Sequence, residues 1–171
     1  HARAGWYASG PAGLSAATVH QGKELSFTNL LNLDAAARIA LEFVEPAAVV
    51  IKHTNPCGVA TGATPAEAYL RAREADPLSA FGGIVGLNCP IDVETATALI
   101  GTFIEAVIAP AIVDSVNVLR TLSAKPNPRV VTASFDVPDF ARVARPVLVG
   151  RVVRPGEGAT DGGGLWRATP D

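Results

Sequence analysis

The sequence predicts an α/β protein, in which helices and short buried strands alternate along the chain. Continuous apolar runs, typical of strands buried on both faces of a sheet, occur at residues 47–51, 84–87 and 104–109. Helical signals separate them: apolar residues at helical spacing, or a capping residue followed by such a pattern. Alternation of this kind is typical of βαβ units, so we expect a mostly parallel sheet.

The helices are predicted from their periodicity and their ends. The first is expected to begin near residues 32–34, where apolar residues start to recur at helical spacing, and Pro46 forces its end. The second is expected over residues 64–75, because a threonine, a proline and a glutamate at its start form a capping box. Residues 1–31 lack strong periodicity and are interpreted as an irregular lead-in. The remaining predicted elements are a helix from Asp92, a helix over residues 114–124 and a strand over residues 129–132.

The chain is predicted to be one soluble globular domain whose character changes towards its end. It has 171 residues, of which 49% are hydrophobic, enough for a sizeable core. It begins with His1 and contains no methionine, so we interpret it as a fragment or an excised domain. Beyond Thr132 valine, arginine, proline and glycine are abundant, and only residues 147–153 have a strand pattern. We therefore divide it into an α/β unit, residues 1–132, and a divergent, partly irregular extension of the same domain, residues 133–171.

Charge and composition disfavour several classes of function. The net charge of -2 gives neither the basic footprint of a nucleic-acid-binding protein nor a polybasic membrane signal. No apolar run approaches the roughly 20 residues that cross a bilayer. Cys57 and Cys89 are too few for a disulfide framework and form no CxxC pair. We therefore expect a reduced, cytoplasmic compartment.

The first candidate for chemistry is the end of the first apolar run, where Lys52 and His53 precede the turn-like residues 54–58, TNPCG. Ligands of open α/β sheets bind beyond the carboxyl ends of strands, and histidine titrates near neutral pH. His53 could act as a general base and Lys52 as an electrostatic stabiliser or proton donor. Adjacent strand residues point to opposite faces, so both could serve one site only where the strand gives way to the turn. The alternative is a snorkelling lysine and a hydrogen-bonded histidine at a strand end.

A second candidate is the stretch DPLSAFGG, residues 76–83. Ser79, the Phe81 ring and the backbone at Gly82 could hold a planar, polar ligand, because glycine lets a ligand approach the backbone closely. The alternative is a tight loop with Phe81 in the core. The stretch lacks the GxxxxGK[ST] spacing of a P-loop.

Two isolated polar residues complete the candidates. Glu105 lies in the apolar run 103–108, where a carboxylate is costly unless it is paired or faces a site. Asn29, just before the first predicted helix, is by itself an ordinary cap or turn residue.

A zinc nucleobase deaminase is the alternative enzyme. Its signature is H-x-E followed by P-C-x-x-C. In this chain Asn55 stands where the proton-shuttling glutamate should follow His53, and Cys57 and Cys89 are not spaced as a pair of ligands. We therefore predict no metal site.

Taken together, two stretches resemble one specific family. IKHTNPCGVA at residues 51–60 and DPLSAFGGI at residues 76–84 are similar to the transformylase portion of a bifunctional purine-biosynthesis enzyme. That enzyme is 5-aminoimidazole-4-carboxamide ribonucleotide (AICAR) formyltransferase/IMP cyclohydrolase. Further similar segments follow in the same order: GKELSFTNLLNLDAA at 22–36, FIEAVIAP at 103–110 and GGGL at 162–165. The opening HARAGWY resembles the end of the family's RYGENPHQ motif.

The resemblance implies one of the two cytidine-deaminase-like repeats of the transformylase domain, a three-layer structure with helices on both faces of the sheet. Lys52 and His53 match the family's catalytic lysine and histidine. Phe81 and Gly82 match residues that hold the aminoimidazole carboxamide. The other expected substrate-binding residues are Asn29, Asn55, Ser79 and Glu105. The implied reaction transfers a formyl group from the cosubstrate 10-formyltetrahydrofolate to the amine of AICAR, without a metal.

The chain also departs from the family's pattern. The arginine and tyrosine of RYGENPHQ lie upstream of His1, and GGGLWRATPD has Trp166 and Arg167 where two apolar residues are expected. By this resemblance, the cyclohydrolase domain and the second transformylase half, with most of the folate site, are expected to lie outside these 171 residues. Because the family's sites lie across a homodimer interface, we expect this piece alone to be poorly active or inactive. The alternative without catalysis is a nucleotide-binding remnant.

Overall fold

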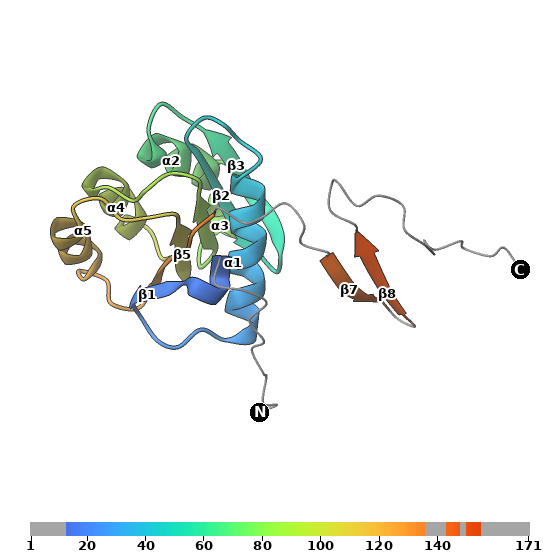
Figure 1. Ribbon diagram of the computed structural model, residues 1–171. Coiled ribbons are helices and arrows are strands. Elements are labelled where there is room, and N and C mark those ends of the chain that lie inside the picture. The colour runs from blue at the N-terminus through green and yellow to red at the C-terminus, as the bar shows by residue number, and fades with distance from the viewer. Residues whose placement is uncertain (1–12, 136–142, 148–149, 155–171) are drawn as a thin grey trace, which may run out of the picture. The chain divides into compact units, whose positions relative to one another are not determined.

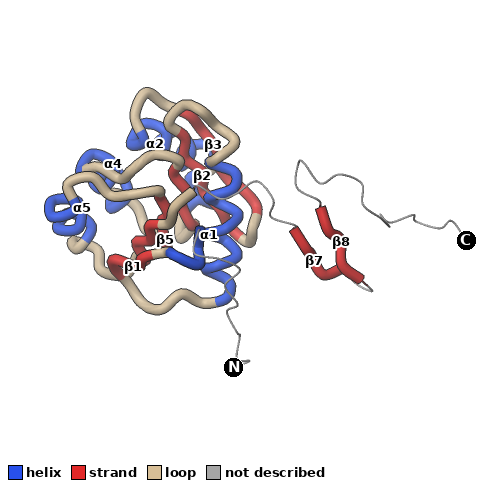
Figure 2. Tube along the Cα trace, viewed as in Figure 1, coloured by secondary structure: helices blue, strands red, loops and turns tan. Residues whose placement is uncertain are grey.

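The computed structural model describes residues 13–135, 143–147 and 150–154. The chain divides into two compact units, His1–Phe135 and Asp136–Asp171. The first unit contains a six-stranded sheet with helices packed against it (Figure 1, Figure 2). All the candidate site residues belong to this first unit.

The second unit contains a strand pair in its described part. β7 (Val143–Val147) and β8 (Gly150–Arg154) run antiparallel, with Val143 opposite Arg154 and Val147 opposite Gly150. The single strand predicted over residues 147–153 is therefore wrong. Its residues are shared between the end of one strand and most of the next, because valines in neighbouring strands form one apolar stretch in the sequence.

Six strands form one open sheet in the first unit. Their order across the sheet is β1 (Thr18–Gln21), β6 (Arg129–Thr132), β5 (Ala106–Ala109), β4 (Ile84–Leu87), β2 (Ala47–Lys52) and β3 (Asn55–Thr61). The β6–β5 and β5–β4 pairs are parallel, whereas β1–β6, β4–β2 and β2–β3 are antiparallel. The α/β class is confirmed, but the prediction of a mostly parallel sheet is wrong. The main reason is the short connection between β2 and β3, because strands joined by a tight turn pair antiparallel.

Helices cover both faces of this sheet (Figure 1). In the described residues they are α1 (Phe27–Ala40), α2 (Pro65–Ala75), α3 (Pro77–Ala80), α4 (Val93–Ile100) and α5 (Ser115–Leu122). α1 packs on one face against Val49 and Ile51 of β2. α2, α4 and α5 pack on the other face, where Ala48 and Val50 of the same strand are buried. Successive residues of β2 therefore enter opposite cores, as the pleat of a strand requires.

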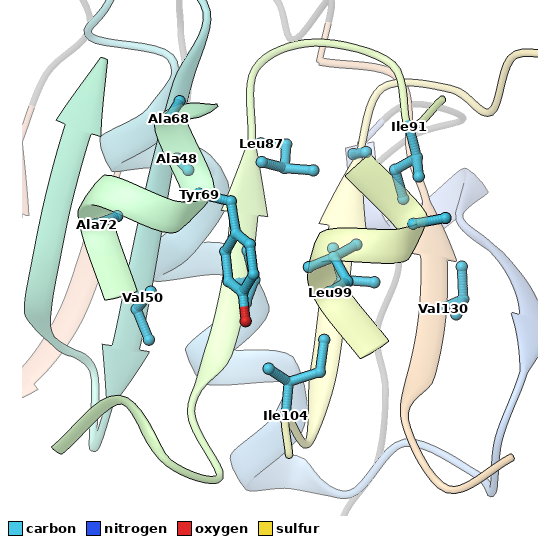
Figure 3. Close-up of a cluster of buried hydrophobic side chains, with 14 of the residues drawn as sticks. Ala48, Val50, Ala68, Tyr69, Ala72, Leu87, Ile91, Leu99, Ile104 and Val130 are labelled. Atoms are coloured by element: carbon cyan, nitrogen blue, oxygen red, sulfur yellow. The ribbon is translucent and has the colours of Figure 1, made fainter. Parts of the chain in front are cut away.

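The larger core lies between the sheet and the helices α2, α4 and α5 (Figure 3). Tyr69 of α2, Leu87 of β4 and Leu99 of α4 are almost completely buried there. Burial also raises the pKa of the Tyr69 hydroxyl, because the phenolate is poorly solvated in an apolar core. These contacts fix the sheet whose edge carries the candidate site.

The start of α1 differs from the prediction. The helix begins at Phe27, not near residues 32–34, because Ser26 caps it and exchanges hydrogen bonds with Asn29 in a capping box. The preceding stretch is not entirely irregular either, since it contains a 3₁₀ turn (Gly13–Ala16) and β1. At its other end α1 stops at Ala40, several residues before Pro46. Val44, which lies between them, is 99% exposed and therefore does not belong to a buried helix face.

Other predicted boundaries agree more closely. α2 has its predicted cap: the Glu67 backbone N–H donates to Thr64 Oγ1 at 3.1 Å. α4 is capped by Asp92, as predicted. The stretch 76–83, predicted as a loop, contains the short helix α3. β5 begins only at Ala106, which leaves Glu105 outside the strand. No helix in the described part of the chain is long and apolar enough to cross a membrane.

Candidate active site

The candidate residues gather on the side of the sheet where β2 ends and where β4, β5 and β6 begin, which we call the sheet edge. The direction of β2 brings them together there. In register across the sheet, Ile51 of β2 lies opposite Ile84 of β4, Ile84 opposite Ala106 of β5, and Ala106 opposite Arg129 of β6. β2 runs against β4, so its carboxyl end lies beside the amino ends of β4, β5 and β6. The predicted rule, a site beyond the carboxyl ends of the strands, therefore applies to β2 but not to its parallel neighbours.

Lys52 and His53 are followed by a two-residue turn. Lys52 pairs with Asn55 across the β2–β3 hairpin, and His53 and Thr54 connect them. Both connecting residues have positive φ, 53° at His53 and 63° at Thr54. Two positive φ angles are typical of the type I′ turn, which asparagine and glycine usually form. The predicted break after the strand is present, but the longer turn predicted over residues 54–58 is wrong, because β3 already begins at Asn55.

Side-chain hydrogen bonds stabilise this turn, some from residues of the hairpin itself and one from another element. The Thr54 hydroxyl and the Asn55 side-chain amide both donate to the His53 carbonyl, at 2.6 and 2.9 Å. From outside, Oδ1 of Asn32 in α1 accepts the Thr54 backbone N–H at 2.6 Å. The His53 side chain itself is exposed, which leaves its ring open to a ligand.

Ser79 and Asp76 form the start of α3, on the same side of the sheet as Lys52. Hydrogen bonds from the side chain and the backbone of Ser79 lower the pKa of the Asp76 carboxyl, and the positive charge of Lys52 lowers it further. The Ser79 backbone N–H donates to Asp76 Oδ1 at 3.0 Å, so Ser79 and Asp76 cap the short helix. The structure therefore places Ser79 near the start of α3 in a capping arrangement.

Phe81 and Gly82 form an exposed aromatic corner. Phe81 is 57% exposed, so its alternative placement in the core is wrong. Its ring lies 5.3 Å from that of Phe103, between centroids, with the planes at 49°. Gly82 has a φ of 73° and donates its N–H to the Phe103 carbonyl at 2.8 Å. Phe103, which the sequence did not single out, fixes both the ring and the backbone of this corner.

Glu105 is paired rather than buried in an apolar strand. Its side chain is 45% exposed, and its Oε1 accepts a hydrogen bond from Nδ2 of Asn29 at 2.7 Å. Nη1 of Arg129 lies 3.6 Å from the same oxygen. The Asn29 side chain is buried and also accepts the Ser26 backbone N–H in the capping box. The sequence reasoning missed Arg129, although a lone arginine at the start of a predicted strand was a usable signal.

The candidate residues form neighbouring groups rather than one connected network. Asn29, Glu105 and Arg129 are linked directly, and so are His53 and Asn55. Within residues 13–135, no hydrogen bond or ion pair joins these two groups. In the described ranges, no cluster of three or more histidine, cysteine, aspartate or glutamate side chains could hold a metal ion.

Comparison with known proteins identifies the family. The model of the AICARFT/IMPCHase bienzyme family matches residues 1–157. The chain belongs to this family. A relative in Gloeothece citriformis (strain PCC 7424), "Bifunctional purine biosynthesis protein PurH", is 46% identical over 179 aligned residues. That alignment covers 100% of this chain and 34% of the relative.

A second member of the AICARFT/IMPCHase family gives the same result. The protein of the same name from Thermosynechococcus vestitus (strain NIES-2133 / IAM M-273 / BP-1) is 56% identical over 137 residues, covering 77% of this chain and 26% of the relative. The chain thus spans about a third or less of the length of these family members. Among solved structures, "Acinetobacter baumannii RibD, form 1" aligns with a TM-score of 0.44 and 17% identity, covering 58% of this chain and 35% of that one.

Proposed function

We propose that this chain supplies part of a site that transfers a formyl group from 10-formyltetrahydrofolate to the amine of AICAR. The parent enzyme would act in purine biosynthesis and also have IMP cyclohydrolase activity. The observation that carries the proposal is the turn after β2, which brings Lys52 and His53 to the same sheet edge as Phe81 and Glu105. Family membership supports the choice of reaction.

The chemistry requires a base and a positive charge. The amine of AICAR is a poor nucleophile, because the adjoining ring and carboxamide withdraw its lone pair. In the proposed reaction His53 takes the proton of this amine as its nitrogen attacks the formyl carbon. Lys52 stabilises the negative charge that develops on the formyl oxygen, or protonates the departing folate nitrogen. The exposure of His53 agrees with a role in which its ring meets a ligand.

The neighbouring groups suit the recognition of AICAR. An exposed phenyl ring offers a face on which a planar aminoimidazole can stack, and Phe81 presents such a ring. The backbone at Gly82 carries no side chain that would block the approach of the carboxamide. We assign further polar contacts with the nucleotide to Asn29, Asn55, Ser79 and Glu105.

The proposed site is incomplete within this chain. We infer that the unit is one of two deaminase-like repeats, that the second repeat supplies most of the folate site, and that the complete enzyme is a cytoplasmic homodimer. The short coverage of the curated relatives supports this inference. The chain alone should then be inactive or nearly so.

The test uses this chain joined to the parts that its relatives carry beyond it. His53→Ala should lower kcat for formyl transfer by at least about 100-fold, the usual scale of general-base catalysis. Lys52→Ala should lower kcat far more than it weakens AICAR binding, measured by calorimetry. The matched controls His20→Ala and Lys125→Ala, on side chains outside the proposed site, should retain kcat.

Two results would contradict these assignments. An equal loss of turnover and AICAR affinity in Lys52→Ala would exclude its role in the transition state. A completed protein whose melting temperature rises with AICAR, but which transfers no formyl group, would instead be a nucleotide-binding remnant.

A further inference from the structure

One buried side chain of α1 connects this helix to the turn that carries His53. Asn32 is only 6% exposed, and its Oδ1 accepts the backbone N–H of Thr54 at 2.6 Å. Its Nδ2 donates to the Thr28 carbonyl, one helical turn earlier, at 2.9 Å. Both ends of the amide are used, so the side chain cannot rotate without losing hydrogen bonds in a buried place.

The bond from Asn32 differs in kind from the other bonds of the turn. The hydroxyl of Thr54 and the amide of Asn55 bond to the His53 carbonyl, so they belong to the hairpin and move with it. Asn32, in contrast, lies in α1. Among the described residues, it is the side chain from outside the β2–β3 hairpin that hydrogen-bonds to the turn. It can therefore fix where the turn lies relative to the rest of the sheet edge.

The same helix also holds the other polar group of this edge. Asn29 precedes Asn32 by three residues, so the two amides lie on neighbouring positions of one helix face. Nδ2 of Asn29 donates to Glu105 at 2.7 Å. Together with Thr95, these asparagines are the buried polar residues of the described chain. One rigid helix thus sets the positions of both the His53 turn and the Glu105 carboxylate.

We propose that Asn32 is a positioning residue for His53. The proposal rests on the proposed function, in which the His53 ring must meet the amine of AICAR. Positive φ at two residues with side chains is strained and persists only when the surroundings fix it. Without the acceptor on Asn32, the turn relaxes and the imidazole moves. A displacement of about 1 Å can cost about 100-fold in rate, although no group that touches the substrate has been removed.

The test compares two variants of Asn32 in the completed enzyme. Asn32→Leu keeps a side chain branched at Cγ but has no acceptor for the Thr54 N–H. It should lower kcat by about 10- to 100-fold while KM for AICAR changes less than about threefold. Asn32→Asp keeps an acceptor oxygen and loses only the donor to Thr28. It should keep kcat within about threefold of the wild type, even though burial of its charge lowers the melting temperature.

Asn88→Leu is the matched control. Asn88 makes the same kind of bond at the opposite end of β2, where its Oδ1 accepts the Ala47 backbone N–H at 2.7 Å. Leucine at this position should lower the melting temperature and leave kcat unchanged. Equal losses of kcat in Asn32→Leu and Asn88→Leu would make Asn32 a general stabiliser and overturn the proposal. A folded but inactive Asn32→Asp would overturn it too, even if Asn32→Leu does not fold.

Amide hydrogen exchange separates this proposal from the proposed function. Asn32→Leu should speed exchange at Thr54 in the 171-residue chain itself, whether or not that chain transfers formyl groups. If the completed wild-type enzyme shows no transfer, the proposed function fails and the positioning role fails with it. If transfer is present but Asn32→Leu changes neither Thr54 exchange nor kcat, the positioning role alone is wrong.

Discussion

Thr54 is a β-branched residue in a backbone conformation that residues of its kind rarely adopt. Its φ of 63° follows directly on the 53° of His53. Such conformations cost of order 1–3 kcal/mol each and often occur at functional sites. Thr54 makes two hydrogen bonds. Glycine at this position would keep the bond from the backbone N–H to Asn32 and lose only the bond from the hydroxyl to the His53 carbonyl.

Replacing Thr54 with glycine should relieve this strain. We expect Thr54→Gly to leave the free energy of unfolding unchanged or to raise it by about 1 kcal/mol, because glycine adopts positive φ without steric cost. Urea denaturation measures the change.

Thr97→Gly is the control for the Thr54 variant. Thr97 is also exposed, and its hydroxyl also donates to a backbone carbonyl, that of Val93, but it lies inside α4. Glycine there should destabilise by about 0.5 kcal/mol, because threonine is itself a weaker helix former than alanine. If both variants lose stability equally, the turn is not strained at Thr54.

The residue types of the candidate site were predictable, but their partners were not. Composition and position indicate that Lys52 and His53 are chemically suited to acid–base work. The physical cost of a carboxylate in an apolar run correctly predicted that Glu105 must be paired or face a site. A lone arginine at a strand start could have marked Arg129 as a candidate, but that Glu105 pairs with Arg129 and Asn29 could not be derived from spacing, because only the folded sheet brings them together. Whether Asn55, Ser79, Phe81 and Gly82 contact a substrate stays a prediction.

At the scale of elements, prediction succeeded where local signals were strong. α2 begins where its threonine cap and proline require it. The start of α1 was missed because asparagine, rather than glutamate or glutamine, completes its capping box. The first half of β3 was interpreted as a turn because it contains Pro56 and Gly58. Both are tolerated because β3 is an edge strand, where a missing N–H does no harm and a glycine permits close packing.

The close packing of β3 against α2 gives a prediction for Gly58. A Cβ atom added at this position would lie 1.8 Å from the Ala72 carbonyl oxygen, which is backbone and cannot move aside cheaply. Gly58→Ala should therefore destabilise the protein by about 3 kcal/mol, at the upper end of the range for overpacked cores. Thermal unfolding followed by circular dichroism measures this.

A second glycine provides the comparison for Gly58. Gly101 follows α4 with φ −61°, a value that any residue adopts, and its added Cβ would lie 3.0 Å from the Ala98 oxygen. Gly101→Ala should change the stability by less than about 0.5 kcal/mol. A Gly58→Ala protein as stable as Gly101→Ala would mean that β3 and α2 are further apart than the structure shows.

At the scale of the whole molecule, the direction of β2 was the feature that the sequence could not supply. The apolar run 47–51 has the composition of a buried strand in either direction. Its orientation follows from the short turn to β3 and from the crossover through α2 to β4, which together leave β2 antiparallel between two strands of the opposite direction. The location of the candidate site therefore depends on topology rather than on any local motif.

The division of the chain into two compact units leads to a prediction for a shortened protein. All six strands of the main sheet and both core clusters belong to the unit His1–Phe135. A protein ending at Phe135 should therefore still unfold in one cooperative thermal transition, with far-ultraviolet circular dichroism typical of a mixed α/β fold. Loss of the cooperative transition would show that residues 136–171 are needed to fold the sheet.

The pairing of β1 with β6 sets an order of assembly. Thr18 lies opposite Thr132, and the His20 ring bonds to the hydroxyl of that same residue. Gln21 reaches the carbonyls of Lys125 and Pro128. On a ribosome, β1 emerges among the first residues of this unit, but its partner strand is among the last. The β2–β3 hairpin at the other edge of the sheet, whose strands are close in sequence, can form much sooner. The first strand to be made should thus be the last to join the sheet, and until then one side of β6 stays unpaired.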